Sequence, residues 1–197
     1  MVAGSLRAGV LALQGDVAEH RRALAACGAA PLEVRTREDL EAVDALVIPG
    51  GESTTMLKLI DRYELRDPLV KRIEAGMPTF GICAGAILLA SRTSDGEPPL
   101  GVLDLTVHRN AYGRQRESFE AEVDMAGVGV VPAVFIRAPV FEEPGPGLEV
   151  LATWAGCPVA VRSGNVLAIA FHPELAGTLA LHRYFLEDVA ARSEGVA

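Results

Sequence analysis

The chain has 197 residues, 50% of them hydrophobic and 22% charged, which predicts one domain, residues 1–197, with a full hydrophobic core. A net charge of −8 without a basic tract argues against nucleic acid or an anionic membrane as partner. Three widely spaced cysteines suit a reducing cytosol better than a disulfide framework. No run approaches the roughly 18–20 apolar residues of a membrane helix, and the apolar N-terminus reads as a strand, not a signal peptide. We therefore expect a cytoplasmic protein.

The first half of the chain alternates predicted strands and helices. Strands are expected at Ala8–Leu13, Leu32–Arg35, Ala45–Ile48 and Met77–Ile82. Helices are expected at Val17–Cys27, Arg37–Ala42, Thr54–Tyr63, Leu65–Ala75 and Ala84–Ala90, with Asp16 capping the first. Strands that alternate with helices form βαβ units, so we expect a mostly parallel central sheet flanked by helices.

The second half is predicted to add antiparallel strands to this α/β fold. Short strand-like segments separated by Gly/Pro turns occur at Leu103–His108, Phe119–Val123, Ala133–Arg137, Glu149–Thr153, Val159–Arg162 and Val166–Ala170. A last helix is expected over Leu175–Ala191.

The most informative stretch is Thr79–Ala90, TFGICAGAILLA, in which Gly81 and Gly85 flank Cys83. Gly-x-Cys-x-Gly between a strand and a helix is the cysteine form of a nucleophile elbow, a strained turn that exposes one side chain above a sheet. The glycines are required because strand and helix backbones crowd there. The alternative is a small buried cysteine between two packing glycines.

A second glycine-rich turn follows another predicted strand, at Gly50–Gly51. The carboxyl ends of parallel strands share one edge of the sheet, so this turn and Cys83 should lie close together. The backbone N–H groups of Gly51 and Ala84 could then form a two-donor oxyanion hole. An ordinary strand–helix turn is the alternative.

A nucleophilic cysteine needs a base, and the chain has four histidines. His20 and His182 lie on predicted helices among charged residues and are expected to face solvent, whereas His108 at a strand end stays a candidate. His172 follows the apolar run Val166–Phe171, and Glu174, two residues on, can orient its ring. We therefore expect cysteine acyl transfer by Cys83, His172 and Glu174.

Two arginines next to predicted strands are candidates for substrate binding. Arg109 begins a dense polar stretch, and Arg137 ends an apolar segment. Either arginine could form an internal ion pair or clamp a substrate carboxylate.

Several segments, in this order along the chain, resemble the class I (triad) glutamine amidotransferases. Within that class the chain is similar to the glutaminase subunits of pyridoxal 5′-phosphate synthase. The segments are LALQGDVAEH (11–20), PGGESTT (49–55), GICAGAILLA (81–90), RNAYGRQRESFE (109–120), FIRAP (135–139) and AFHPEL (170–175).

The resemblance implies a flavodoxin-like α/β fold and hydrolysis of L-glutamine to glutamate and ammonia by the triad Cys83, His172 and Glu174. It places glutamine contacts at Gly51, Glu52, Ser53, Arg109, Ile136 and Arg137. It also implies a partner, the (β/α)8 barrel subunit of the synthase, which takes the ammonia together with ribose 5-phosphate and glyceraldehyde 3-phosphate. The turn at residues 14–16 and its helix resemble the part involved in docking. No metal and no cofactor of the subunit's own are expected.

The chain departs from the family pattern after His-Pro-Glu-Leu, where Ala176, Thr178 and Ala180 replace polar or charged residues. These changes bear on the start of the last helix and on partner contacts. Cys27 and Cys157 match no catalytic position and are expected to be structural. The rival hypotheses are a stand-alone cysteine-elbow amidohydrolase and a non-enzymatic regulatory subunit; the latter would be expected to have lost a triad residue.

Overall fold

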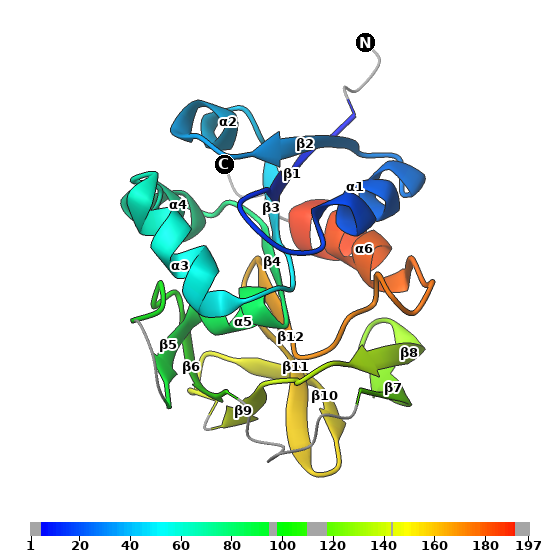
Figure 1. The fold of residues 1–197 in the computed structure, drawn as a ribbon. Coiled ribbons are helices and arrows are strands. Elements are labelled where there is room, and N and C mark those ends of the chain that lie inside the picture. The colour runs from blue at the N-terminus through cyan, green and yellow to red at the C-terminus, as the bar shows by residue number, and fades with distance from the viewer. Residues whose placement is uncertain (1–4, 95–97, 110–117, 143, 192–197) are drawn as a thin grey trace.

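The computed structural model describes residues 5–94, 98–109, 118–142 and 144–191. A seven-stranded sheet forms the centre of the molecule (Figure 1). In spatial order its strands are β10 (Glu149–Trp154), β11 (Cys157–Ser163), β12 (Val166–Ile169), β4 (Thr79–Ile82), β3 (Ala45–Ile48), β1 (Arg7–Leu11) and β2 (Ala30–Val34).

The pairing confirms the expected mostly parallel sheet with antiparallel additions. The neighbours from β12 through β4, β3 and β1 to β2 are all parallel, whereas β11 is antiparallel to β12 and to β10. The order β2-β1-β3-β4-β12 is the flavodoxin-like order. Every residue of β3, β4 and β12 is buried, because helices cover both faces of a parallel sheet.

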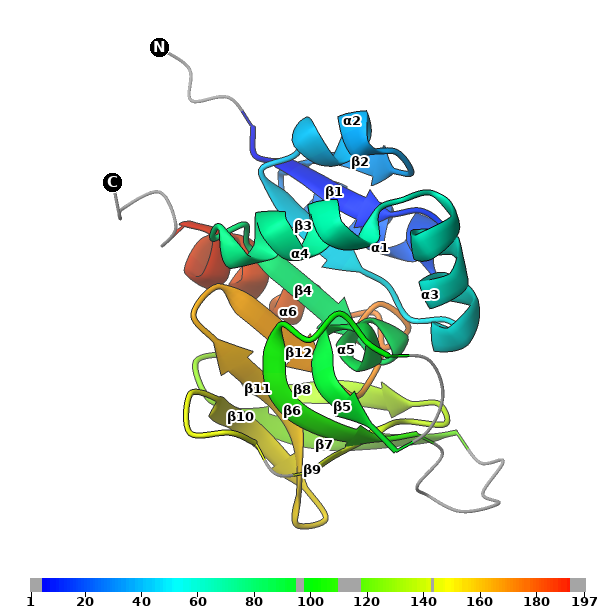
Figure 2. The same cartoon turned by 90° about the vertical axis from the view of Figure 1, so that its left-hand side faces the viewer.

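Two layers of helices enclose the sheet (Figures 1 and 2). One face carries α1 (Val17–Ala26) and α6 (Ala180–Tyr184), the latter continued by a π-helical segment, η1 (Phe185–Ala190). The other face carries α3 (Ser53–Arg62), α4 (Arg66–Glu74) and α5 (Ala84–Leu89), and α2 (Arg37–Glu41) lies beside β2. None of the described helices has the length and apolar character needed to cross a bilayer.

The smaller β elements lie toward the β10–β12 side of the molecule (Figure 2). They comprise a sheet of β5 (Ala90–Thr93), β6 (Leu103–His108) and β9 (Val140–Glu142), and a ribbon of β7 (Phe119–Met125) and β8 (Gly129–Phe135). The ribbon is tied to the central unit through Val134, whose carbonyl accepts the backbone N–H of His172 at 2.8 Å.

Some predicted boundaries are wrong. The last helix begins at Ala180, not Leu175, because the intervening residues form turns, and the Thr178 hydroxyl accepts the Ala180 N–H at 3.2 Å. Ala90 leaves the predicted helix to pair with Leu103 in β5 and β6, and β9 was not predicted. The strand predicted to end at Arg137 ends at Phe135.

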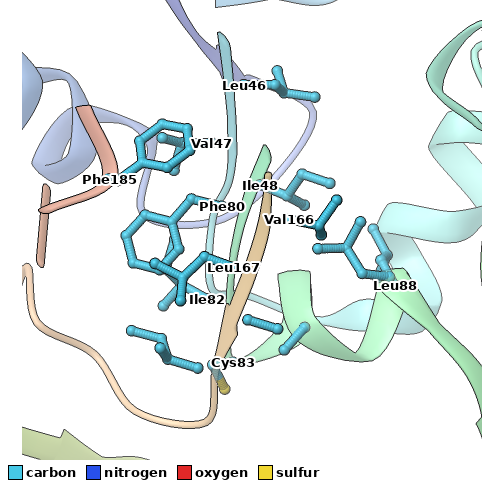
Figure 3. Packing of buried hydrophobic residues seen from close by; sticks show 14 of the residues in the cluster. Leu46, Val47, Ile48, Phe80, Ile82, Cys83, Leu88, Val166, Leu167 and Phe185 are labelled. Atoms are coloured by element: carbon cyan, nitrogen blue, oxygen red, sulfur yellow. The ribbon is translucent and has the colours of Figure 1, made fainter. Parts of the chain in front are cut away.

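One continuous hydrophobic core joins the sheet to its helices. Figure 3 shows Phe80, Ile82 and Leu167 on the central strands packing toward Phe185 of η1. In the same view Cys83 lies at the end of this packed region, with its sulfur directed away from the apolar side chains.

Candidate active site

Four loops that follow strands β1, β3, β4 and β12 meet at the carboxyl edge of the sheet, where they help to form a cavity of about 500 Å³. Open parallel sheets bind their ligands at this edge. The cavity is lined by Gln14, Asp16, Gly51, Glu52, Ser53, Cys83, Ala84, Ile87, Arg109, Ile136, Arg137, His172 and Leu175.

Cys83 has the backbone conformation of a nucleophile elbow. Its φ of 49° and ψ of −102° lie outside the regions favoured for a residue with a side chain. A Cβ on Gly85 would collide with the Ile48 carbonyl, and one on Gly81 would lie 2.8 Å from the Gly85 oxygen. The crowding that the motif predicts is therefore present. It forces the strained turn and leaves the sulfur at the cavity wall.

The His172 ring faces the same cavity, and Glu174 lies behind it. The His172 Nδ1–H donates to Glu174 Oε1 at 2.7 Å, and the exposed fractions of the two side chains are 5% and 0%. A Cβ on Gly50 would strike the His172 ring, so the glycine of the β3 loop makes room for it. The sequence predicts this pairing from extended backbone, but Pro173 and Glu174 lie in a run of turns, and it is this turn that brings the two side chains together.

The electrostatics favour a proton on His172. Burial by itself lowers the pKa of His172, but hydrogen bonds to Cys83 and Glu174, and attraction to their negative charges, raise it from 6.5 to about 10. The net effect stabilises an imidazolium between two anionic groups. A thiolate is the nucleophilic form of cysteine, so this arrangement suits attack on a carbonyl carbon.

The β3 loop is held by the turn that follows β1. The Gln14 side-chain carbonyl accepts the Glu52 N–H at 2.7 Å, and the Asp16 N–H donates to the Gly50 carbonyl at 3.2 Å. Gly51 and Ala84, the predicted oxyanion donors, both line the cavity beside Cys83. Asp16 occupies the N-cap position of α1, but its side chain makes no capping bond, contrary to our expectation.

The carboxylate of Glu52, a predicted substrate contact, already accepts hydrogen bonds within the protein. It caps α3 by accepting the N–H groups of Thr54 at 3.0 Å and Thr55 at 2.7 Å. The Thr55 hydroxyl, and then these backbone groups, outweigh the opposing effect of burial and lower the pKa of Glu52 to about 2. Arg109 lies beside it, donating to Thr54 Oγ1 at 3.0 Å, with Glu52 Oε1 at 3.6 Å.

The remaining predicted substrate contacts also reach the cavity. Ser53, at the start of α3, is buried, and Ile136 and Arg137 come from the segment after β8. Arg137 has a φ of 44°, the left-handed conformation in which a side chain is strained, and it is exposed. Most of the polar stretch that follows Arg109, residues 110–117, lies outside the described residues.

Four lining residues were not predicted as part of the site: Gln14, Asp16, Ile87 and Leu175. A signal for the first two was present, because residues 14–16 follow a parallel strand and so share the sheet edge with Cys83. Asp16 Oδ2 lies 3.7 Å from His172 Nδ1. With Glu174, these two residues could surround a metal ion, but the ion would have to displace the His172–Glu174 hydrogen bond.

The other histidines lie outside the cavity. His108 Nε2 contacts Glu142 Oε2 at 2.7 Å, in the small sheet, so the structure does not bring this candidate base to Cys83. The prediction that His20 and His182 face solvent is wrong: both are fully buried. His20 shares the inner face of α1 with Ala23 and Leu24, a helical spacing that could have revealed its burial.

Burial of these two histidines predicts acid sensitivity. Burial lowers the pKa of His182 to about 4, and burial and then repulsion from His182 and His172 lower that of His20 well below 6.5. In the unfolded chain both histidines take up a proton near pH 6.5, whereas in the folded protein they do so only at lower pH. Their contribution to the free energy of unfolding is therefore complete above pH 6.5 and is lost as the pH falls toward 4. For His182 alone the loss is about 3 kcal/mol.

We therefore expect urea unfolding of His182→Gln to show a shallower loss of stability between pH 6.5 and 4 than the unsubstituted chain. The absolute stability of the variant at neutral pH does not enter this comparison. Equal slopes for the two chains would contradict the prediction.

A mostly parallel α/β sheet, a cysteine on a strained elbow and a facing histidine–glutamate pair are together typical of hydrolases with a cysteine nucleophile. The model of the SNO glutamine amidotransferase family matches residues 10–191, and the chain belongs to this family.

Curated relatives and a solved structure agree with this assignment. The chain is 55% identical to the pyridoxal 5′-phosphate synthase subunit PdxT of Nocardia farcinica, over 94% of this chain and 87% of the relative. It is 55% identical to the subunit of the same name from Pelotomaculum thermopropionicum, over 92% and 94%. A crystal structure of a glutamine amidotransferase superposes with a TM-score of 0.89 at 52% identity, over 93% and 98% of the two chains. The expected fold class is thereby confirmed.

Proposed function

We propose that this chain is the glutaminase subunit of a pyridoxal 5′-phosphate synthase. It hydrolyses L-glutamine to L-glutamate and ammonia. The ammonia passes to the barrel subunit that makes pyridoxal 5′-phosphate from ribose 5-phosphate and glyceraldehyde 3-phosphate. The observation that carries the proposal is Cys83 on a strained elbow opposite the His172–Glu174 pair, in a cavity that also holds Arg109 and Arg137.

The reaction has two half-steps. The Cys83 thiolate attacks the side-chain amide carbon of glutamine, and the backbone N–H groups of Gly51 and Ala84 stabilise the resulting oxyanion. His172 gives its proton to the leaving nitrogen, so ammonia departs and a glutamyl thioester forms. His172 then takes a proton from water, whose oxygen attacks the thioester and releases glutamate. Glu174 orients the ring and stabilises its imidazolium form.

The cavity has charges of both signs, as a zwitterionic amino acid requires. Arg109 and Arg137 offer cations for the α-carboxylate, whereas Glu52 and Asp16 offer carboxylates for the α-ammonium group. Since Glu52 already caps α3, its remaining lone pairs are those available to a ligand. Ser53 and Ile136 complete the wall beside them.

Replacing Arg137 by alanine should raise the KM for glutamine by about tenfold or more and change kcat little. A hydrogen bond between charged groups is worth roughly 1.5–3 kcal/mol, which is lost equally in the ground state and the transition state. Arg137→Lys keeps the charge but loses the planar guanidinium, so its KM should lie between those of the unsubstituted chain and of Arg137→Ala. Steady-state glutaminase kinetics measure the effect, and an unchanged KM would assign Arg137 to the scaffold.

The proposed function is tested by measuring glutamate release from glutamine with and without the barrel subunit. Strong stimulation by the barrel is expected, because ammonia protonates in bulk water and a subunit that feeds a partner gains from acting only when docked. High activity that ignores the barrel would favour the stand-alone amidohydrolase. No glutamate release in either case, from folded protein, would overturn the proposed function.

A further inference from the structure

Behind the Glu174 carboxylate lie two buried histidines from different helices, in contact with each other. His20 of α1 places its Nε2 3.6 Å from Glu174 Oε1, and its Nδ1 lies 2.9 Å from Nε2 of His182 in α6. The side chains of His20 and Glu174 are both 0% exposed. The order of contacts is therefore Cys83, His172, Glu174, His20 and His182.

This inner group contains the buried polar atoms that the described structure leaves without a hydrogen-bond partner. They are His20 Nε2, Glu174 Oε2 and His182 Nδ1. A buried donor or acceptor without a partner is costly, so such atoms indicate an interaction that the site needs. Two of the three belong to His20 and Glu174, which already contact each other. His20 Nε2 lies 3.6 Å from Oε1, the carboxylate oxygen that also meets His172, and a shift of roughly 0.5 Å would bring this contact to hydrogen-bond length.

The contacts specify where the ring protons lie. His20 is neutral, because burial and its histidine neighbours hold its pKa well below 6.5. A neutral His20 can donate from Nε2 toward Glu174 only if its Nδ1 accepts a hydrogen bond from the Nε2–H of His182. That tautomer leaves His182 Nδ1 as a bare acceptor, and the nearest ring to His182 besides His20 is the edge-on Phe80. Each ring thereby points one N–H toward the carboxylate.

We propose that His20, held by His182, is a positioning residue that donates its Nε2–H to the Glu174 carboxylate and so fixes the orientation in which Glu174 meets His172. A buried carboxylate with a single donor can rotate and is poorly solvated when the imidazolium forms beside it. A second N–H removes both problems. This inference rests on the proposed function, since it concerns the same triad, and it adds two residues that do not line the cavity.

The tautomer can be tested in the unsubstituted protein, without any assay of activity. Long-range nitrogen–proton NMR correlations of 15N-histidine-labelled chain report which ring nitrogen carries the proton. We expect His20 and His182 to be neutral at pH 7, each protonated on Nε2. A His20 protonated on Nδ1 would overturn the proposal, because that ring could not donate to Glu174.

Two substitutions of His20 separate positioning from packing. Glutamine places an amide N–H near the position of Nε2, whereas asparagine reaches only the position of Nδ1. With the barrel subunit present, His20→Asn should lower kcat about tenfold or more, the effect of losing one hydrogen bond to a charged group, with KM for glutamine unchanged. His20→Gln should recover most of the rate. Equal kcat values for the two variants, whether normal or low, would overturn the proposal.

His108→Gln is the matched control, because His108 also contacts a glutamate, Glu142 at 2.7 Å, but lies outside the cavity. It should keep normal kcat and KM. The Nδ1 proton of His172 supplies a spectroscopic readout: its resonance should shift in His20→Asn and stay in place in His108→Gln. An unshifted resonance in His20→Asn would count against the proposal.

These tests distinguish the inference from the function on which it rests. If the unsubstituted chain releases glutamate and Cys83→Ala does not, but both His20 variants behave normally, only the positioning role fails. If the unsubstituted chain has no glutaminase activity, the proposed function fails, and the tautomer measurement still decides whether His20 donates to Glu174.

Discussion

Cys83→Ala will abolish glutamate release, lowering kcat by at least about ten-thousandfold, while leaving the fold intact. The substitution removes the sulfur and nothing else, because alanine keeps the Cβ and tolerates the elbow about as well as cysteine does. Glutamate release in the presence of the barrel subunit measures the loss.

The structural control for Cys83→Ala is its circular dichroism and its binding to the barrel subunit, both of which should match the unsubstituted chain. A covalent test adds to it: glutamine mixed rapidly with the unsubstituted protein should give a glutamyl adduct by mass spectrometry, and Cys83→Ala should give none. Continued ammonia release by a folded Cys83→Ala chain would refute the thioester mechanism.

His172→Asn will reduce kcat by roughly a thousandfold, because the site loses both the proton carrier and the cation that stabilises the thiolate. Asparagine can still meet Glu174 near the position of Nδ1, but it cannot deliver a proton to the leaving nitrogen. The rate is measured at saturating glutamine, so that weakened binding does not contribute.

His108→Asn is the matched control for His172→Asn, since both histidines contact a glutamate at 2.7 Å and only one faces Cys83. We expect its rate to be normal. The reverse result, a normal rate for His172→Asn and no activity for His108→Asn, would show that His108 is the catalytic base. Because the triad acts as a unit, adding His172→Asn to Cys83→Ala should cost little more than Cys83→Ala alone.

Local sequence determined the parts of this protein in which neighbouring residues decide the structure. The runs that became β3, β4 and β12 were predicted because strands buried on both faces of a parallel sheet are nearly continuous in apolar residues, with Thr79 as the polar exception here. The cysteine elbow was predicted from the pattern Gly-x-Cys-x-Gly between a strand and a helix, and the Ile48 carbonyl beside Gly85 is the backbone crowding that this pattern implies. The pairing of His172 with Glu174 was predicted from their two-residue spacing, although the chain at Pro173 and Glu174 forms turns where an extended segment was expected.

Contacts between segments that are distant in the chain decided two further features: where the helix after Cys83 ends, and the burial of two histidines. Ala90 entered a strand because Leu103 pairs with it, a contact that a local helical pattern does not register. His20 and His182 are 162 positions apart in the chain, and only the packing of α1 beside α6 makes them a buried pair behind Glu174. Local sequence therefore determined the candidate catalytic residues, and the packing of α1 beside α6 against the sheet decided which side chains lie behind them.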